Sequence, residues 1–179
     1  CMAKKAEIKE PDLKGAIDYV LTYEELRDLF TTTDIDLEHL EEDNVPHASR
    51  AGIRYAYAGG VAEAVAATVK RLDPNRKIEV KVRRADSVPD CKAMIDSILK
   101  GNREGNFFEG MGCRGGCVGG PKALVPKEQG KLNVMAYSDE STYKTPAENP
   151  YVIELLKQLG FETVEEFLTK SDLYDRKFD

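Results

Sequence analysis

The segment from Phe107 to Pro121 constrains this chain more than any other part of the sequence, because it places two cysteines in an almost bare backbone. Cys113 and Cys117 are four positions apart, and glycines stand at 110, 112, 115, 116, 119 and 120. Glycine has no Cβ atom and adopts positive φ at little cost, so such a loop can wrap closely around a bulky group. Thiolates are the usual ligands of iron–sulfur clusters, and amide N–H groups tune such clusters. The segment therefore predicts a thiolate-bound metal cluster, whose type the residues leave open.

Two other uses of this cysteine pair stay open. A structural zinc site needs four ligands and more often has a C-x-x-C spacing. The only histidines, His39 and His47, lie in an acidic stretch of the sequence. A regulatory disulfide between Cys113 and Cys117 is compatible with their separation. We favour the cluster, because a bland structural loop would not usually need two thiols among so many glycines.

We interpret Cys91, which lies outside this segment, as a packed thiol, since free cysteine usually behaves as a small hydrophobic residue.

Strand-like and helix-like patterns alternate along the chain, which predicts an α/β fold. We expect strands at 17–21 and 78–82, and loops at 31–50 and 126–148. We expect helices from Thr22, with Glu25 as its capping-box partner, and at 61–72, 90–100, 151–159 and 164–170. A second capping-box pattern, formed by Thr163 and Glu166, precedes the last helix. No linker rich in Gly, Pro or Ser divides the chain. The expected architecture is one domain over residues 1–179, a small mixed sheet flanked by helices.

The composition narrows the class of protein. The net charge is −6 and no basic stripe is present, so we do not expect nucleic acid as a partner. No apolar run approaches the roughly 20 residues that a membrane span needs, and no secretory signal is visible. Four cysteines in 179 residues are too few for a disulfide scaffold, which favours reduced thiols in a cytoplasmic protein. The first residue is Cys1 rather than Met, and we expect a fragment of a longer chain.

The stretch from Glu109 to Gly120 resembles the third signature of the iron-only hydrogenases, E-x-M-A-C-x-G-G-C-x-x-G-G. In that family the first cysteine binds the four-iron cubane (4Fe-4S) of the catalytic H-cluster. The second cysteine bridges the cubane to a two-iron subsite that carries carbon monoxide and cyanide. The resemblance implies that Cys113 is a cubane ligand, that Cys117 is the bridging ligand, and that Met111 packs beside the two-iron subsite.

The start of the chain resembles the second family signature, P-C-x-A-K-K-x-E. This resemblance implies that Cys1 is another cubane ligand and that Lys4 contacts a cyanide of the two-iron subsite. An ammonium group is a compact donor suited to an anionic diatomic ligand. Without the resemblance, a terminal cysteine and a lysine pair would be taken as ordinary surface residues. The stretch Gly59–Ala64 also resembles the family sequence G-G-V-x-E-A.

The sequence departs from the family pattern at several positions. Arg114 stands where proline is common, and Pro121 with Lys122 replaces a further glycine and a glutamine. Gly110 and Gly112 replace valine and alanine. The first family signature, T-S-C-C-P, does not occur in this sequence, so the fourth cubane ligand is missing from it. These departures indicate a divergent branch of the family.

The resemblance implies that the chain is one lobe of an H-cluster domain, the C-terminal part of the catalytic domain in a hydrogenase large subunit. We expect the parent protein to reduce protons reversibly to H2, in an anaerobic cytosol. Its expected partners are the N-terminal half of the H-cluster domain and a ferredoxin-like electron carrier or fused iron–sulfur domains. The isolated chain is expected to be inactive. The alternatives are a hydrogen or redox sensor that keeps the cofactor, and a plain iron–sulfur electron-transfer protein.

Overall fold

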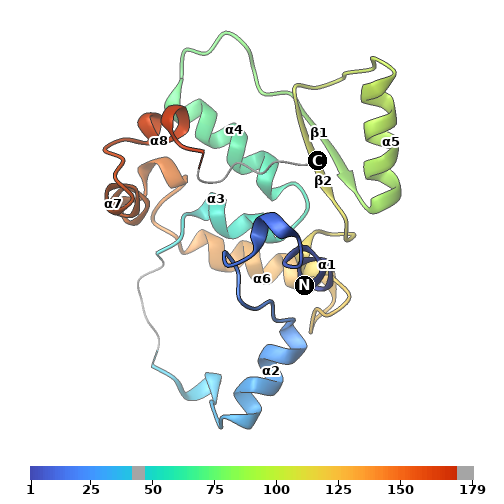
Figure 1. Ribbon diagram of the computed structural model, residues 1–179, viewed down its shortest axis with the longest axis vertical. Coiled ribbons are helices and arrows are strands. Elements are labelled where there is room, and N and C mark those ends of the chain that lie inside the picture. The colour runs from blue at the N-terminus through green and yellow to red at the C-terminus, as the bar shows by residue number, and fades with distance from the viewer. Residues whose placement is uncertain (42–46, 173–179) are drawn as a thin grey trace.

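The computed structural model describes residues 1–41 and 47–172. Its helices are α1 (Met2–Glu7), α2 (Tyr23–Thr32), α3 (Arg50–Ile53), α4 (Gly60–Leu72), α5 (Val88–Leu99), α6 (Lys127–Asp139), α7 (Pro150–Gln158) and α8 (Val164–Lys170). Its strands are β1 (Val82–Asp86) and β2 (Phe107–Met111). Short 3-10 turns are η1 (Pro11–Leu13), η2 (Leu37–His39), η3 (Arg54–Ala56), η4 (Cys117–Gly119) and η5 (Pro146–Glu148). The α/β expectation is confirmed (Figure 1).

The two strands form a parallel pair, with Val82 opposite Phe107 and Asp86 opposite Met111. Parallel neighbours need a crossover connection, and α5 provides it. The Oγ of Ser87 accepts a hydrogen bond from the backbone N–H of Asp90 at 3.2 Å and so caps α5 directly after β1. Figure 1 shows α5 on one side of the strands and α4 on the other. In the part of the chain that the structure describes, the sheet is therefore purely parallel rather than mixed.

The elements expected at 17–21, 78–82 and 126–148 differ from those of the structure. Residues 17–21 are irregular, because no neighbouring strand offers a hydrogen-bonding ladder to them. The strand expected at 78–82 begins only at Val82, where pairing with β2 begins, and continues to Asp86. The loop expected at 126–148 contains α6, a continuous polar helix that includes Gly130. A Cβ on Gly130 would lie 3.1 Å from the Cβ of Val118, so close packing against η4, rather than local pattern, explains this helix.

The helix-start signals were more reliable. Thr22 Oγ1 accepts from the N–H of Glu25 at 3.2 Å, and Glu25 Oε2 accepts from the N–H of Thr22 at 2.8 Å, which confirms the capping box. Only half of the second box forms, since Thr163 accepts from Glu166 N–H while the Glu166 carboxylate accepts from Glu162 N–H.

The expected loop at 31–50 is also only partly right. It includes the last residues of α2, the turn η2 and the first residue of α3, and its residues 42–46 lie outside the described part of the chain. The other expected helices correspond to α4, α5, α7 and α8.

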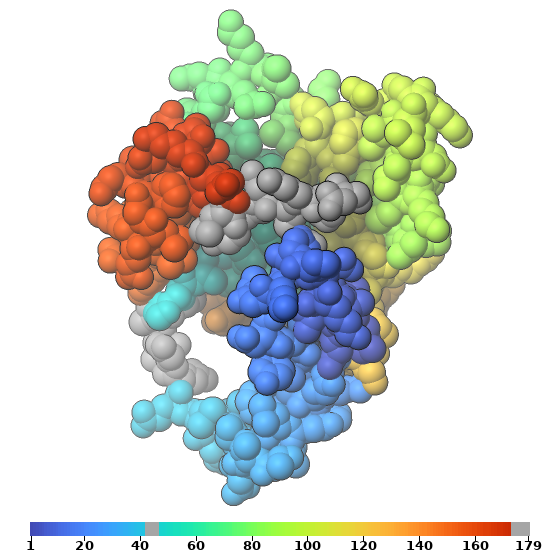
Figure 2. All heavy atoms as spheres, in the orientation of Figure 1, coloured from blue at the N-terminus to red at the C-terminus, as the bar shows by residue number. Residues whose placement is uncertain are grey.

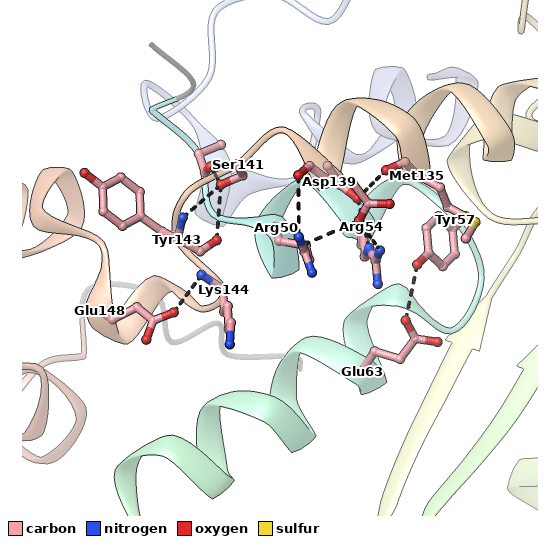
Figure 3. Close-up of polar contacts among 12 residues, drawn as sticks. Arg50, Arg54, Tyr57, Glu63, Met135, Asp139, Ser141, Tyr143, Lys144 and Glu148 are labelled. Carbon is pink, nitrogen blue, oxygen red and sulfur yellow. Dashed lines mark hydrogen bonds and ion pairs between the residues drawn. The ribbon is translucent and has the colours of Figure 1, made fainter.

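The body of the molecule is held by small buried side chains and by a polar network (Figure 3). Arg54 donates from Nε to Ser138 Oγ and from Nη2 to Asp139 Oδ1, both at 2.9 Å, and so joins η3 to α6. The backbone N–H of Arg50 donates to the carbonyl of Tyr143 at 2.8 Å, which ties α3 to the segment before α7. This network holds α3, η3 and α6 together, and α4 packs against α3 and η3.

Residues 1–41 form an arm that packs less tightly than this body. No residue of α1 or α2 is buried. Figure 1 shows α2 projecting beyond the other helices, and Figure 2 shows the arm as the blue lobe in front of the body. Within the arm, an ion pair of 2.7 Å between Lys5 and Glu25 connects α1 to α2. Within the described ranges, no helix has the length and apolar character needed to cross a bilayer.

The Glu25 carboxyl gives the arm a measurable pH dependence. The Lys5 ammonium, followed by the N–H of Thr22, lowers the pKa of Glu25 from 4.5 to about 2. Because the folded pKa is depressed, the ionised carboxyl stabilises the arm above about pH 4.5, and this stabilisation is lost as the pH falls toward 2. An NMR titration of the Glu25 side chain should show the low pKa, and Lys5→Gln should raise it. A midpoint near 4.5 in the unmodified protein would contradict the expected pairing.

Candidate functional site

Three thiols that are far apart in the sequence line one cavity. Cys1, Cys113 and Cys117 surround a space of about 460 Å³, and Met111 lines the same space. Its apolar wall includes Leu21, Tyr23 and Leu26 of the arm, and its floor includes Gly112, Gly116 and Gly120. We call this space the thiol cavity. None of the four cysteines, all within the described residues, is in a disulfide.

The strands set the position of the cysteine loop. β1 ends at Asp86 and β2 ends at Met111, so the loop starts where the carboxyl ends of both strands meet, the usual place for ligands in parallel α/β sheets. The N–H of Gly115 donates to Asp86 Oδ1 at 2.8 Å, and the N–H of Ala58 donates to the carbonyl of Gly115 at 3.0 Å. The loop is thereby fixed between the end of β1 and the start of α4.

The glycines of this loop are required by geometry at two positions. Gly116 has φ of +84°, and a Cβ there would lie 2.5 Å from the backbone nitrogen of Ala58 and 2.7 Å from the carbonyl carbon of Tyr57. A Cβ on Gly119 would lie 1.8 Å from the carbonyl oxygen of Arg114. In both cases the obstacle is backbone, which does not move aside as a flexible side chain can. The loop can therefore approach α4 and fold back on itself only without side chains here.

Glu109 links β2 to the N-terminus of α4. The side chain is buried on β2, and its carboxylate accepts from the N–H of Gly59 at 2.6 Å and of Ala62 at 2.8 Å. These donors lie at the N-terminus of α4, whose cap residue, Gly59, has no side chain of its own to offer. The Gly-Gly pair before an Ala-rich helix was the signal that a cap from elsewhere is needed.

The remaining candidate ligands lie away from the thiol cavity. Cys91 Sγ is 3.7 Å from the carbonyl oxygen of Met111 and 3.9 Å from that of Ala85, which agrees with the packed thiol expected there. His39 pairs with Asp36 at 2.7 Å, and the ring of His47 stacks on Tyr151 at 4.3 Å between centroids. Among the described residues, no three His, Cys, Asp or Glu side chains are grouped so as to hold one metal ion.

Comparison with known proteins decides the family. The model of the family described as "Iron only hydrogenase large subunit, C-terminal domain" matches residues 1–121. This chain belongs to that hydrogenase family. It is also similar to Iron hydrogenase 1 of Clostridium pasteurianum, with 26% identity over 168 residues. That match covers 75% of this chain and 29% of the clostridial protein, so the chain spans less than a third of that relative.

The donor set of this hydrogenase domain fits an iron–sulfur cluster. Each iron of a cluster takes its own thiolate, and the three thiols lie around a cavity rather than converging on one point. Three glycines of the loop, Gly112, Gly116 and Gly120, line the cavity and add no side chain to it. Three thiols around one cavity thus fit three of the four ligands that a four-iron cluster takes.

Lys4 is the expected site residue that lies apart from Cys1, Met111, Cys113 and Cys117. It does not line the thiol cavity but a neighbouring hollow of about 440 Å³, which Cys1 also lines. Its ammonium pairs with Glu7 one turn further along α1, and its side chain is 61% exposed. To contact a ligand in the thiol cavity, the Lys4 ammonium would have to give up its ion pair with Glu7.

Replacing Glu109 with glutamine should destabilise this hydrogenase domain by about 1.5–3 kcal/mol, because one of the two donors then faces an amide NH2 group. Urea unfolding of the 179-residue chain measures the change. Glu104→Gln is the matched control, since Glu104 only forms an exposed ion pair with Arg83 at 2.9 Å, and it should cost about 0–1 kcal/mol. Equal effects of the two substitutions would show that the Glu109 contacts do not support α4.

Proposed function

We propose that this chain is part of an iron-only hydrogenase, an oxidoreductase that reversibly reduces protons to H2 at an H-cluster. Cys1 and Cys113 would hold the cubane in this proposal, and Cys117 would be the thiolate shared with the two-iron subsite. The observation that carries the proposal is the meeting of these three thiols in one cavity, in a chain that belongs to the hydrogenase family. The fourth cubane ligand comes from the N-terminal half of the H-cluster domain.

The H-cluster supplies the redox chemistry when it is bound, and the residues of this chain hold and shield it. Cys113 and Cys117 lie on a loop that Asp86 and Ala58 fix in place, so their thiolates are pre-positioned. Met111 and the arm residues Leu21 and Leu26 give the cavity apolar walls, which limit the access of water. Lys4 would donate to a cyanide ligand of the bound cofactor if its ion pair with Glu7 opened.

A sensor of hydrogen or of redox state is the second candidate, favoured by Arg114 and by the Pro121-Lys122 pair in place of the common family residues. Such a protein would keep the same cofactor and turn over slowly. A plain iron–sulfur electron-transfer protein is the third candidate. It would bind iron and sulfide without carbon monoxide or cyanide.

Infrared spectroscopy separates these candidates. The full-length protein would be produced with its cofactor-maturation machinery and purified without oxygen. Bands of metal-bound carbon monoxide and cyanide are the expected result, and fast hydrogen evolution would then exclude the sensor. Iron and sulfide without these bands would reduce the function to electron transfer. The 179-residue chain alone should evolve no hydrogen, because it holds at most three of the four cubane ligands.

We propose that residues 1–179 form a single domain of a cytoplasmic protein and that the N-terminal half of the H-cluster domain packs against the arm. The arm exposes apolar side chains, among them Tyr19 at 86%, Leu37 at 59% and Leu40 at 57%. Residues 17–21 are apolar except for Asp18 and form no strand in this chain. Electrons reach the cluster from a ferredoxin-like carrier or from fused iron–sulfur domains.

Amide hydrogen exchange tests this placement of the arm. The amides of residues 17–21 should exchange quickly in the 179-residue chain and much more slowly in the full-length protein, because the added half covers them. The interior amides of α4 serve as the internal reference and should be protected in both. Fast exchange at 17–21 in both proteins would contradict the proposed contact.

A further inference from the structure

Lys122 brings a positive charge to the wall of the thiol cavity. It follows Cys117 by five positions and lines the cavity together with Cys113 and Cys117. Its Nζ donates to Glu24 Oε2 at 2.6 Å, across 98 positions of sequence. Glu24 belongs to the first turn of α2 and is not among the residues that line the cavity. The cation therefore lies at the cavity, and its counter-charge lies on the arm.

We propose that Lys122 and Glu24 set the reduction potential of the cluster held by Cys113 and Cys117, Lys122 raising it and Glu24 lowering it. The inference rests on the proposed function for the presence of the cluster. Reduction adds one electron to the cluster, and no bond of the protein forms or breaks. A nearby positive charge stabilises the added electron, and a negative charge opposes it. Lys122, which lines the cavity, should have the larger effect of the two.

The two side chains are exposed enough for salt to weaken their effect but not to remove it. The Lys122 side chain is 44% exposed and that of Glu24 is 38% exposed. Glu24, through hydrogen bonding and through its charge, raises the pKa of Lys122, which keeps the ammonium protonated over the physiological range. Screening by added salt should therefore shrink the potential shifts caused by changing either residue.

A purely structural role for the Lys122–Glu24 ion pair predicts a different pattern of potential shifts. The pair also links the cysteine loop to α2, and removal of either partner breaks this same link. If only the link mattered, Lys122→Gln and Glu24→Gln would change the potential in the same direction or leave it unchanged. If the charges matter, the two substitutions shift the potential in opposite directions.

The experiment is a redox titration of the full-length holoprotein followed by electron paramagnetic resonance, with iron content measured for every variant. We expect Lys122→Gln to lower the midpoint potential, Glu24→Gln to raise it, and the double variant to lie between them. Lys122→Arg should keep the potential of the unmodified protein. The matched control is the exposed pair of Lys170 and Glu166 in α8, 2.8 Å apart, whose substitution should shift nothing.

Three results would overturn the inference. Shifts of the same sign in the two single variants, or no shift in Glu24→Gln, would exclude the electrostatic role while leaving the proposed function intact. If Lys122→Gln loses the cluster, the inference can still be tested, because the direction of the potential shift in Glu24→Gln remains measurable. The third result is the absence of an iron–sulfur signal in the unmodified protein, which would overturn the proposed function and this inference together.

Discussion

Replacing Cys113 with serine should remove most of the iron from the full-length holoprotein, whereas replacing Cys91 with alanine should leave the iron content unchanged. Cys113 lines the thiol cavity, and a serine hydroxyl is a much poorer ligand for iron than a thiolate. Cys91 is a fair control, because its Sγ faces the carbonyl oxygens of Ala85 and Met111 on the strands. Both changes remove one thiol, but only the first removes it from the cavity.

Iron and sulfide analysis of the purified proteins gives the primary measurement, and electron paramagnetic resonance shows which cluster remains. Cys1→Ser and Cys117→Ser should resemble Cys113→Ser, because all three thiols line the same cavity. Full iron content in Cys113→Ser, or equal iron loss in Cys91→Ala, would contradict the assignment of these thiols as ligands.

Gly116→Ala should be among the most damaging single substitutions in this chain, although it adds only one methyl group. Its φ of +84° costs an L-residue about 1–2 kcal/mol. Its Cβ would also meet the backbone of Tyr57 and Ala58 at 2.5–2.8 Å, and forcing extra volume into a packed site costs about 1–3 kcal/mol more. The loop must shift to relieve this contact, which moves Cys113 and Cys117.

Gly101 provides a matched control for Gly116→Ala. Its φ is +86°, and no atom lies within 4 Å of the position that a Cβ would take. Gly101→Ala should therefore show the conformational cost alone, with no loss of iron from the holoprotein. Thermal unfolding of the two variants measures the difference in stability, and iron analysis measures the effect on the site. Equal stability and equal iron content would show that the close approach of the loop to α4 is unimportant.

The sequence predicted the features whose signals are local. The capping box of Thr22 and Glu25 needs only four consecutive residues, and the Ala-rich α4 has high intrinsic helix propensity. The cysteine pair was conspicuous because its glycines surround it directly. Met111 lines the cavity with the cysteines, as its place in the hydrogenase signature implied, while Lys4 pairs with Glu7 outside that cavity.

Features that depend on distant partners could not be predicted in the same way. Glu109 caps a helix about fifty positions away, and Lys122 meets Glu24 across 98 positions. Helix α6 has a polar sequence and a glycine at its fourth position, so its local pattern resembles that of a loop. The packing of Val118 against Gly130 is visible only in the structure. Residues 17–21 show the reverse error, because a short apolar segment forms a strand only where a neighbouring strand is present.

The loose packing of the arm gives the proposed cluster a mechanical consequence. Cys1 belongs to an arm whose helices bury no residue, while Cys113 and Cys117 belong to a loop fixed on the body. A cluster bound to all three would act as a cross-link that closes a loop of more than a hundred residues, as a disulfide does, and would restrict the unfolded chain. Damage to the cluster would then remove this cross-link. The sensitivity of the arm to proteases would therefore indicate whether the cluster is intact.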